Sequence, residues 1–198
     1  YRILYRPGYA VQARELTQQQ TMAQAQLSRL GKHIFREGSI VLPGQFSIET
    51  DVDYIKVKDV DASNNEVTLA DFAGQTIYGA TNGISAYVLE VADGVETSSN
   101  TKTLFVRYQS SAAANSQIKT FVASETITAN VGGLVALATD PVGKGSRFVI
   151  SEGTIFAKDH FISFPTQSTI LSRYDSSPTC RVGFTITEDL VRYTEDNS

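Results

Sequence analysis

The sequence predicts a mainly β protein with one long N-terminal α-helix, an α+β chain in which the strands follow the helix. Residues 9–34 place apolar side chains at steps of three and four, which is the period of a helix. Beyond Gly38 the period changes to two, which is the period of a strand. Turn-forming residues separate many short predicted strands, a pattern typical of a small antiparallel β-barrel or sandwich.

The predicted helix runs from residue 11 to residue 36, after a turn at Pro7-Gly8 and before a stop at Gly38. Its interior consists of Gln, Ala, Leu, Arg and Glu, all of which favour helices. Gly31 is the weak position, costing about 1 kcal/mol relative to Ala. We therefore expect a neighbour to pack closely against the helix there.

One side of this helix carries a seam with a strict 4-3 alternation. It consists of Tyr9, Ala13, Leu16, Gln20, Ala23, Leu27, Leu30 and Ile34. A helix that lies on its own sheet shows similar spacing, which is the first interpretation. The second is a coiled-coil interface, in which a single polar seam residue sets register and oligomer number. We expect an oligomer or docking interface at Leu16, Gln20, Ala23, Leu27, Leu30 and Ile34. A homotrimer is preferred, although the repeat does not fix the number.

The chain is expected to fold in three parts. Residues 1–49 hold the turn, the helix and a first hairpin, residues 50–145 form an inserted small β-barrel or sandwich, and residues 146–198 form C-terminal hairpins that pack with the N-terminal part. Strands are expected at 39–42, 54–60, 66–69, 84–91, 103–109, 134–138, 147–151, 154–157, 160–164, 169–172 and 181–187. Turn-rich pieces lie at 61–65, 93–100, 110–116 and 132–133.

An internal similarity supports the insertion. Residues 37–46 align without gaps to residues 152–161, and both read as a strand, a tight turn and a returning strand. The turns are Pro43-Gly44 and Lys158-Asp159. We expect the two hairpins to pair into one sheet under the helix, with chance similarity between β-rich segments as the competing explanation.

Composition restricts the classes of function. The formal charge of −4 and the dispersed 17 Lys and Arg argue against nucleic-acid binding. No apolar window is long enough to span a bilayer. The single cysteine, Cys180, excludes an intrachain disulfide framework and is expected as a small buried hydrophobe. Because the sequence begins at Tyr1 without an initiator methionine, we expect a piece of a longer product.

The motifs indicate neither a cofactor nor a metal. A calcium loop that starts at Asp59 fails, because Asn64 and Ala70 stand where a glycine and a bidentate glutamate are required. Residues 143–146 match only the end of a phosphate loop and are expected as a turn. His33 and His160 lack partners at metal-ligand spacing.

Carboxylates and aromatic residues leave two alternatives open. A glycosidase pair is not excluded by sequence, although the acidic pairs at 188–189 and 195–196 suit a solvated tail. Exposed aromatic residues would suit sugar stacking, but most of them stand at alternating strand positions, which favours core packing.

Several strings resemble a tailed-bacteriophage family, a phage domain of unknown function near the front of long tail-fibre or baseplate-type proteins, notably of cyanophages. The strings are Arg6-Pro-Gly-Tyr-Ala-Val-Gln-Ala-Arg-Glu-Leu-Thr-Gln18, Gln24, Leu30-Gly31, His33-Ile-Phe35 and Glu37-Gly-Ser-Ile-Val41. Residues 151–196 are similar to a later part of the same family, through Glu152-Gly153, Phe161, Thr169-Ile-Leu-Ser-Arg-Tyr174, Arg181-Val-Gly183 and Glu195-Asp196. The resemblance implies a virion structural role and offers no catalytic residues.

The resemblance implies a non-enzymatic virion protein of a phage tail, in the baseplate or at a tail-fibre attachment, and the long helix at the front of a β-rich chain is typical of an assembly part. Its expected partners are further copies of itself and other tail or baseplate proteins. The alternative is a receptor- or glycan-binding module of a tail fibre involved in host attachment. A glycan-degrading enzyme is the third hypothesis, and the sequence shows no recognisable acid pair or metal set for it.

Overall fold

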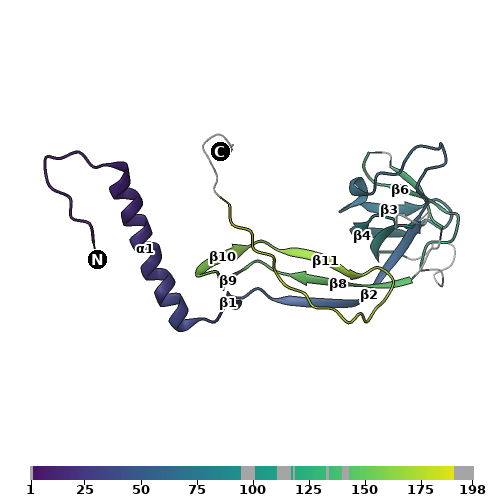
Figure 1. The fold of residues 1–198 in the computed structure, drawn as a ribbon. Coiled ribbons are helices and arrows are strands. Elements are labelled where there is room, and N and C mark those ends of the chain that lie inside the picture. The colour runs from purple at the N-terminus through teal and green to yellow at the C-terminus, as the bar shows by residue number, and fades with distance from the viewer. Residues whose placement is uncertain are drawn as a thin grey trace.

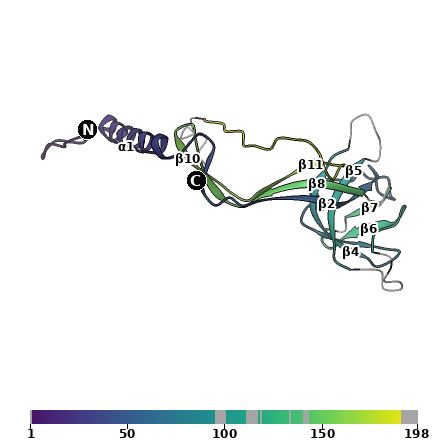
Figure 2. The same cartoon turned by 90° about the horizontal axis from the view of Figure 1, so that it is seen from below.

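The computed structural model describes residues 2–94, 101–110, 117, 119–132, 134–139 and 143–189. The molecule is elongated, with a helix at one end, a β-ribbon in the middle and a head of curled strands at the other end (Figure 1). The view from below shows the same order (Figure 2). The described part of the chain is mainly β with one α-helix near the N-terminus, which confirms the predicted class.

The helix α1 spans Ala13–Ile34, and a short 3-10 helix η1 spans Leu69–Phe72. The strands are β1 (Ser39–Leu42), β2 (Phe46–Val57), β3 (Thr76–Gly79), β4 (Ser85–Ala92), β5 (Lys102–Tyr108), β6 (Thr126–Ala129), β7 (Val135–Leu137), β8 (Gly143–Ile150), β9 (Gly153–Ala157), β10 (His160–Phe164) and β11 (Gln167–Ser172). All strand pairs are antiparallel.

The ribbon consists of three stretches of chain, which are β1 with the start of β2, β8 with β9, and β10 with β11. A small sheet of order β1-β9-β10 continues into the β2-β8-β11 end of the large sheet. At the break the Gln45 N–H donates to Ser151 Oγ, and the Ser151 N–H donates to the Gln45 carbonyl, both at 2.8 Å. Gly44 is buried there and packs closely against Phe164. A Cβ at this position would lie 2.7 Å from the Phe164 ring, so the contact requires glycine. β1 and the first residues of β2, 46–49, therefore form one edge of a continuous ribbon, whereas residues 53–57 of β2 pair with β5 on that side.

The head is the rest of the large sheet, whose full order is β11-β8-β2-β5-β4-β3-β6-β7. The sheet curls until the residue after β7 reaches the end of β2 through a bridge between Val57 and Ala138. The Lys58 N–H donates to the Leu137 carbonyl at 2.8 Å beside this bridge. The curled sheet encloses a core of buried apolar side chains that includes Ile55, Phe72, Ile77, Val88, Leu104, Phe121 and Ile127.

Charged side chains join the ribbon to the head. Arg147 on β8 pairs with Glu49 at 3.4 Å and with Glu90 at 3.3 Å. Arg107 on β5 pairs with Glu49 at 3.2 Å, and the Ser168 hydroxyl donates to Glu90 at 3.2 Å. Strands of both parts contribute to this cluster, so it ties the ribbon to the head where they meet.

The helix is shorter than predicted. It ends at Ile34, and the Phe35 N–H closes the last turn on the Gly31 carbonyl at 2.7 Å. Gly38, the predicted stop, lies beyond this end in a turn with φ of +79°. The Phe35 ring packs against the rings of Phe156 and Phe161 in the ribbon. This packing favours an end of the helix at Ile34 over its continuation through residues 35 and 36.

The prediction of two similar hairpins is half right. β9 and β10 form the second hairpin, with Lys158 and Asp159 at positive φ in its turn. The first is wrong, because β1 pairs with β9 whereas β2 pairs with β8. The two similar segments do meet in one sheet, through the β1–β9 pair.

Three local predictions are also wrong. The strand expected at 66–69 is absent, because Glu66 makes an isolated bridge to Val60 and η1 begins at Leu69. Residues 143–146 begin β8 where a turn was expected. Residues 181–187 form no strand, although their side chains alternate. β3 and β6, each of four residues, were missed.

The three predicted parts stay a prediction. β2 runs across the expected boundary at residues 49–50, and β8 runs across the one at residues 145–146. The expected turns at 93–100, 110–116 and 132–133 lie wholly or partly outside the described residues.

A buried carboxylate fixes the loops of the head and yields a test. Glu125 is 2% exposed, and its oxygens accept the N–H groups of Thr81 at 2.8 Å, Asn82 at 3.2 Å and Val122 at 3.0 Å. Replacing Glu125 with alanine would remove the charged acceptor of three backbone N–H groups, and a hydrogen bond to a charged group contributes about 1.5–3 kcal/mol. We expect Glu125→Ala to lower the free energy of unfolding in urea by about 3 kcal/mol or more.

The matched control is Glu66→Ala. Glu66 is 84% exposed and pairs with Lys102 at 3.4 Å. Its loss is expected to cost at most about 1 kcal/mol. Equal effects of the two substitutions would contradict the role assigned to Glu125.

Candidate interaction surface

The helix projects from the ribbon and leaves its apolar seam in solvent. Gly31 is the buried residue of α1. Leu16, Leu27, Leu30 and Ile34 are 56%, 53%, 56% and 62% exposed, and Gln20 and Ala23 are exposed as well. In Figure 1 the helix extends past the end of the ribbon. The expectation that the helix lies over the paired hairpins is therefore wrong.

The last turn of the helix is attached to the β9–β10 hairpin. A Cβ at Gly31 would collide with the Phe156 ring, which is 2% exposed. The Phe35 ring lies 6.0 Å from that of Phe156 and 5.6 Å, edge-on, from that of Phe161. Lys32 pairs with Asp159 at 2.7 Å. Gly31 is thus the position of close packing that the sequence predicts, and its partner is Phe156.

The N-terminal segment contacts a flank of the helix. The Tyr5 hydroxyl donates to Gln19 Oε1 at 2.7 Å. The Glu15 carboxylate accepts the Gln12 N–H at 3.0 Å, which closes the first turn in a capping box. These contacts order the beginning of the helix without covering the four exposed seam side chains.

The residues beside the seam suit association of identical helices. In heptad notation, positions a and d hold the seam, with a at Ala13, Gln20, Leu27 and Ile34 and d at Leu16, Ala23 and Leu30. The flanking e and g positions hold Gln12, Thr17, Gln19, Gln24, Gln26, Gly31 and His33, none of them acidic, Lys or Arg. The charged residues Arg14, Glu15, Arg29 and Lys32 stand at the outer b, c and f positions. Parallel copies in register would therefore meet little like-charge repulsion at the interface.

Gln20 fits such an arrangement by its chemistry. Its amide both donates and accepts hydrogen bonds, so the same residue on a second helix can satisfy it. A polar residue at a single a position is a known means of setting register.

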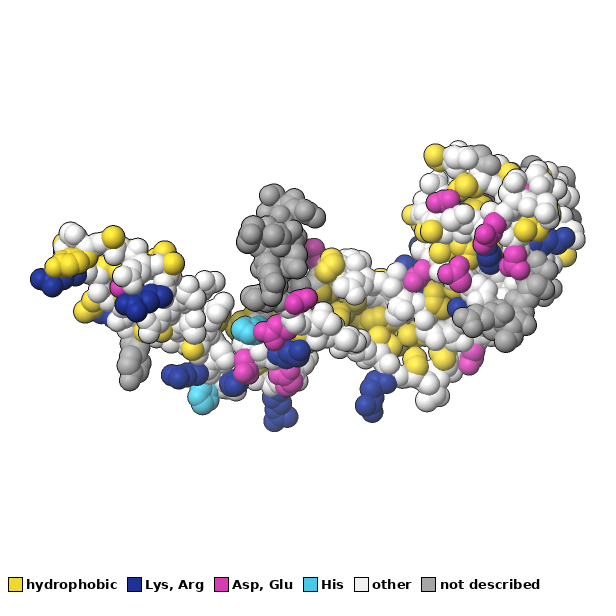
Figure 3. All heavy atoms as spheres, turned by 45° about the horizontal axis from the view of Figure 1, so that its top comes forward, with side chains coloured by type: hydrophobic (Ala, Val, Ile, Leu, Met, Phe, Trp, Pro, Cys, Tyr) yellow, Lys and Arg dark blue, Asp and Glu magenta, His cyan; other side chains and the backbone are white. Residues whose placement is uncertain are grey.

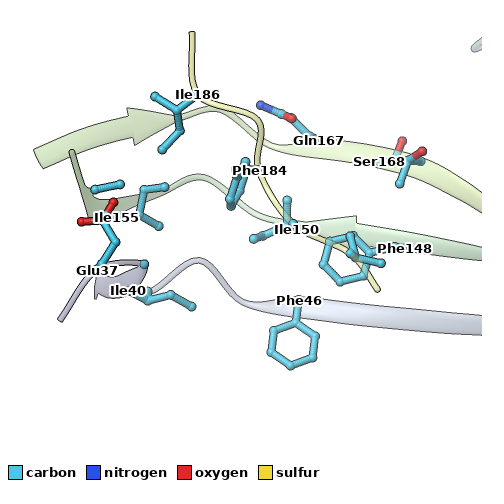
Figure 4. Close-up of a pocket in the computed structure, with 15 residues that line it drawn as sticks. Glu37, Ile40, Phe46, Phe148, Ile150, Ile155, Gln167, Ser168, Phe184 and Ile186 are labelled. Carbon is cyan, nitrogen blue, oxygen red and sulfur yellow. The ribbon is translucent and has the colours of Figure 1, made fainter. Parts of the chain in front are cut away.

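A second apolar surface lies on the ribbon, and the sequence analysis did not identify it. A groove of about 650 Å³ runs between the ribbon and the C-terminal segment, lined among others by Ile40, Phe46, Phe148, Ile150, Val182 and Phe184. Figure 4 shows Phe184 over the ribbon near Ile150. Phe184 contacts the Phe164 ring at 4.6 Å between centroids. The signal in the sequence is the alternation of apolar residues in 40–48 and in 180–186.

The acidic segment 59–70 is organised by its own backbone. The Asp61 carboxylate accepts the N–H groups of Ser63 and Asn65, both at 2.8 Å. The Asn65 N–H, followed by the Asn65 side chain, holds the pKa of Asp61 below its ordinary value. The expected turn at 61–65 is present, and Asp61 serves it as a cap.

The other candidate residues form no chemical site. Within the described ranges, no three or more His, Cys, Asp or Glu side chains come together in a group that could hold a metal ion. No helix of that part of the chain is long and apolar enough to cross a membrane. Cys180 is exposed, so its predicted burial is wrong, because the segment that carries it joins no sheet.

The attachment of the helix gives a direct prediction. Alanine at an open helix position would gain about 1 kcal/mol over glycine. At Gly31 the added methyl group meets the buried Phe156 ring, and overpacking of this kind costs about 1–3 kcal/mol. We expect Gly31→Ala to leave the free energy of unfolding unchanged or lower it, measured by urea titration of the helical circular dichroism. The exposed Gln18→Ala, at an outer f position away from the seam, serves as a control with little effect. A clear stabilisation by Gly31→Ala would contradict the close packing.

The chain was compared with protein-family models, with curated proteins and with solved structures. No family model matches it, and no match appears among the curated proteins or the solved structures. The functional conclusion therefore depends on the chain's own surfaces, which are the helix seam and the apolar face of the ribbon.

Proposed function

We propose that this chain is a non-enzymatic structural component of a phage tail, in the baseplate or at a tail-fibre attachment, and that copies of it associate through the helix seam. The observation that carries the proposal is the seam itself. Leu16, Leu27, Leu30 and Ile34 keep heptad spacing and stay more than half exposed on a helix whose buried residue is Gly31.

Physical chemistry supports association through this seam. A single helix of 22 residues gains most of its stability in proteins from packing its apolar face. Burying one leucine or isoleucine side chain contributes about 1.5–3 kcal/mol. The uncharged flanks and Gln20 favour identical copies in parallel, and a trimer is the preferred number.

Shape and sequence support the place in a tail. The chain holds a helix and a compact head at opposite ends of a ribbon, an arrangement suited to spanning a distance between partners (Figure 1). The motif at residues 6–18 resembles a tail-fibre or baseplate family. In this proposal the head is a small barrel inserted between the helix-bearing and C-terminal parts, and other tail proteins are its partners. The meeting of Val57 and Ala138 supports the barrel.

The alternative is a receptor- or glycan-binding module, favoured by one feature of the head. Tyr78 on β3 and Tyr87 on β4 are 45% and 39% exposed and are diagonal neighbours on the outer side of the sheet. Aromatic rings of this kind can stack on sugars. Under the alternative, the protein binds host surface polysaccharide saturably and Tyr78→Ala weakens that binding. Absence of binding by the intact protein would remove this candidate.

The seam is tested by solution mass. Light scattering after size-exclusion chromatography is expected to give about three times the 21.6 kDa of one chain. Leu27→Glu would place a carboxylate at the centre of the seam and should reduce the mass to that of one chain. Arg29→Glu changes charge at an outer position two residues away and should leave the mass unchanged. Leu27→Glu with an unchanged mass would show that the seam is not the interface.

The location is tested on intact particles of the phage that encodes the sequence. Antibodies raised against the head are expected to label the tail in electron micrographs. Labelling confined to unassembled protein, with bare particles, would contradict the proposed role.

A further inference from the structure

We propose that the ribbon edge formed by β1 and β2 is a second part of the homo-oligomer interface, and that it packs against the same edge of a second copy of this chain. The inference rests on the proposed self-association of the helix and extends it beyond the coiled coil. It identifies residues 40–48 as the surface involved and an identical chain as the occupant.

The edge exposes an unusual amount of apolar surface. Ile40, Phe46 and Ile48 are 51%, 64% and 56% exposed, all within nine residues of chain. Leu42 is 56% exposed as well, but it stands opposite Thr154 on the other face of the ribbon. Figure 3 shows hydrophobic side chains gathered over the ribbon beside the head. Single exposed apolar residues are ordinary, whereas a contiguous apolar strip on an edge strand invites pairing with another chain.

The two faces of the ribbon differ in chemistry at this edge. Phe46 stands opposite Ile150 and Ile48 opposite Phe148, so these four side chains share one face. The alternate residues point to the other face, where Glu49 pairs with Arg147 and Arg107. A partner would therefore bind the apolar face of this edge, and the charged face would remain in solvent.

The chain's own C-terminal segment covers this face incompletely. Its Val182 and Phe184 lie over the ribbon but remain 40% and 41% exposed. In Figure 4 the ring of Phe46 lies on the far side of the groove from Phe184. The groove of about 650 Å³ lies beneath the C-terminal segment, and this segment leaves Phe46 at the outer edge of the face exposed to solvent.

An identical chain is the occupant because the edge follows the helix directly. Four residues, 35–38, separate the end of α1 from the start of β1. Helices that associate through the seam therefore bring the β1 edges of the copies together at a high effective concentration. Parallel helices in register place the same residues of every copy at the same height beside the shared axis, so the apolar strips of neighbouring copies come together there.

Cysteine cross-linking tests the edge separately from the helix. The exposed Cys180 is first replaced by serine, and single cysteines are then introduced as Leu27→Cys in the seam, Ile48→Cys on the apolar face and Ser47→Cys on the charged face of the same strand. Each full-length variant is treated with a short bismaleimide at low protein concentration. We expect covalent dimers from Leu27→Cys and from Ile48→Cys, with at least about tenfold less product from Ser47→Cys.

The outcomes separate the two proposals. Strong cross-linking at Leu27→Cys with equally weak product at Ile48→Cys and Ser47→Cys would overturn the edge interface while keeping the helix interface. No cross-linking at Leu27→Cys, together with the mass of a single chain, would overturn the self-association on which both rest. As a second measurement, Phe46→Ser combined with Ile48→Ser should raise the dissociation constant of the oligomer about tenfold or more. An unchanged constant would overturn the edge interface.

Discussion

The close packing of Gly31 on the Phe156 ring determines how the helix leaves the ribbon, and the exposure of the seam depends on it. With no side chain at Gly31, the last helical turn approaches the β9–β10 hairpin, and Phe35 follows into the aromatic cluster. The helix is held at this end and extends away from the sheet (Figure 1). Its apolar side is therefore available to another chain.

The ribbon makes the head and the helix parts of one unit. β2 and β8 run from the break near Gly44 into the head, and β2 serves both the ribbon and the curled sheet. Arg147, Glu49 and Glu90 hold the joint by ion pairs. Paired strands thus connect the helix to the head. This arrangement suits a structural part that holds the partners of its two ends at a fixed spacing.

The helix, its glycine contact and most of the strands could be predicted from the sequence, because each has a local cause. The 4-3 seam, the β9–β10 hairpin and the turn at Asp61 are encoded within a few residues. The errors arise where the partner is distant. β1 and β2 look like a hairpin but pair with β9 and β8, whose residues lie at least 89 positions further along the chain. Residues 181–187 alternate like a strand, yet they contact the sheet by side chains without joining a ladder. The exposed edge at Phe46 and Ile48 was missed because alternation shows which residues are apolar and does not show which are covered.

The most direct measurement of the central claim is amide hydrogen exchange of residues 13–34 at several protein concentrations. An isolated helix of this length is marginal in water, whereas a helix packed in an oligomer is protected. We predict slow exchange in this segment at high concentration that becomes fast on dilution, while the buried strands of the head stay protected throughout. Fast exchange of the helix at every concentration would contradict association through the seam.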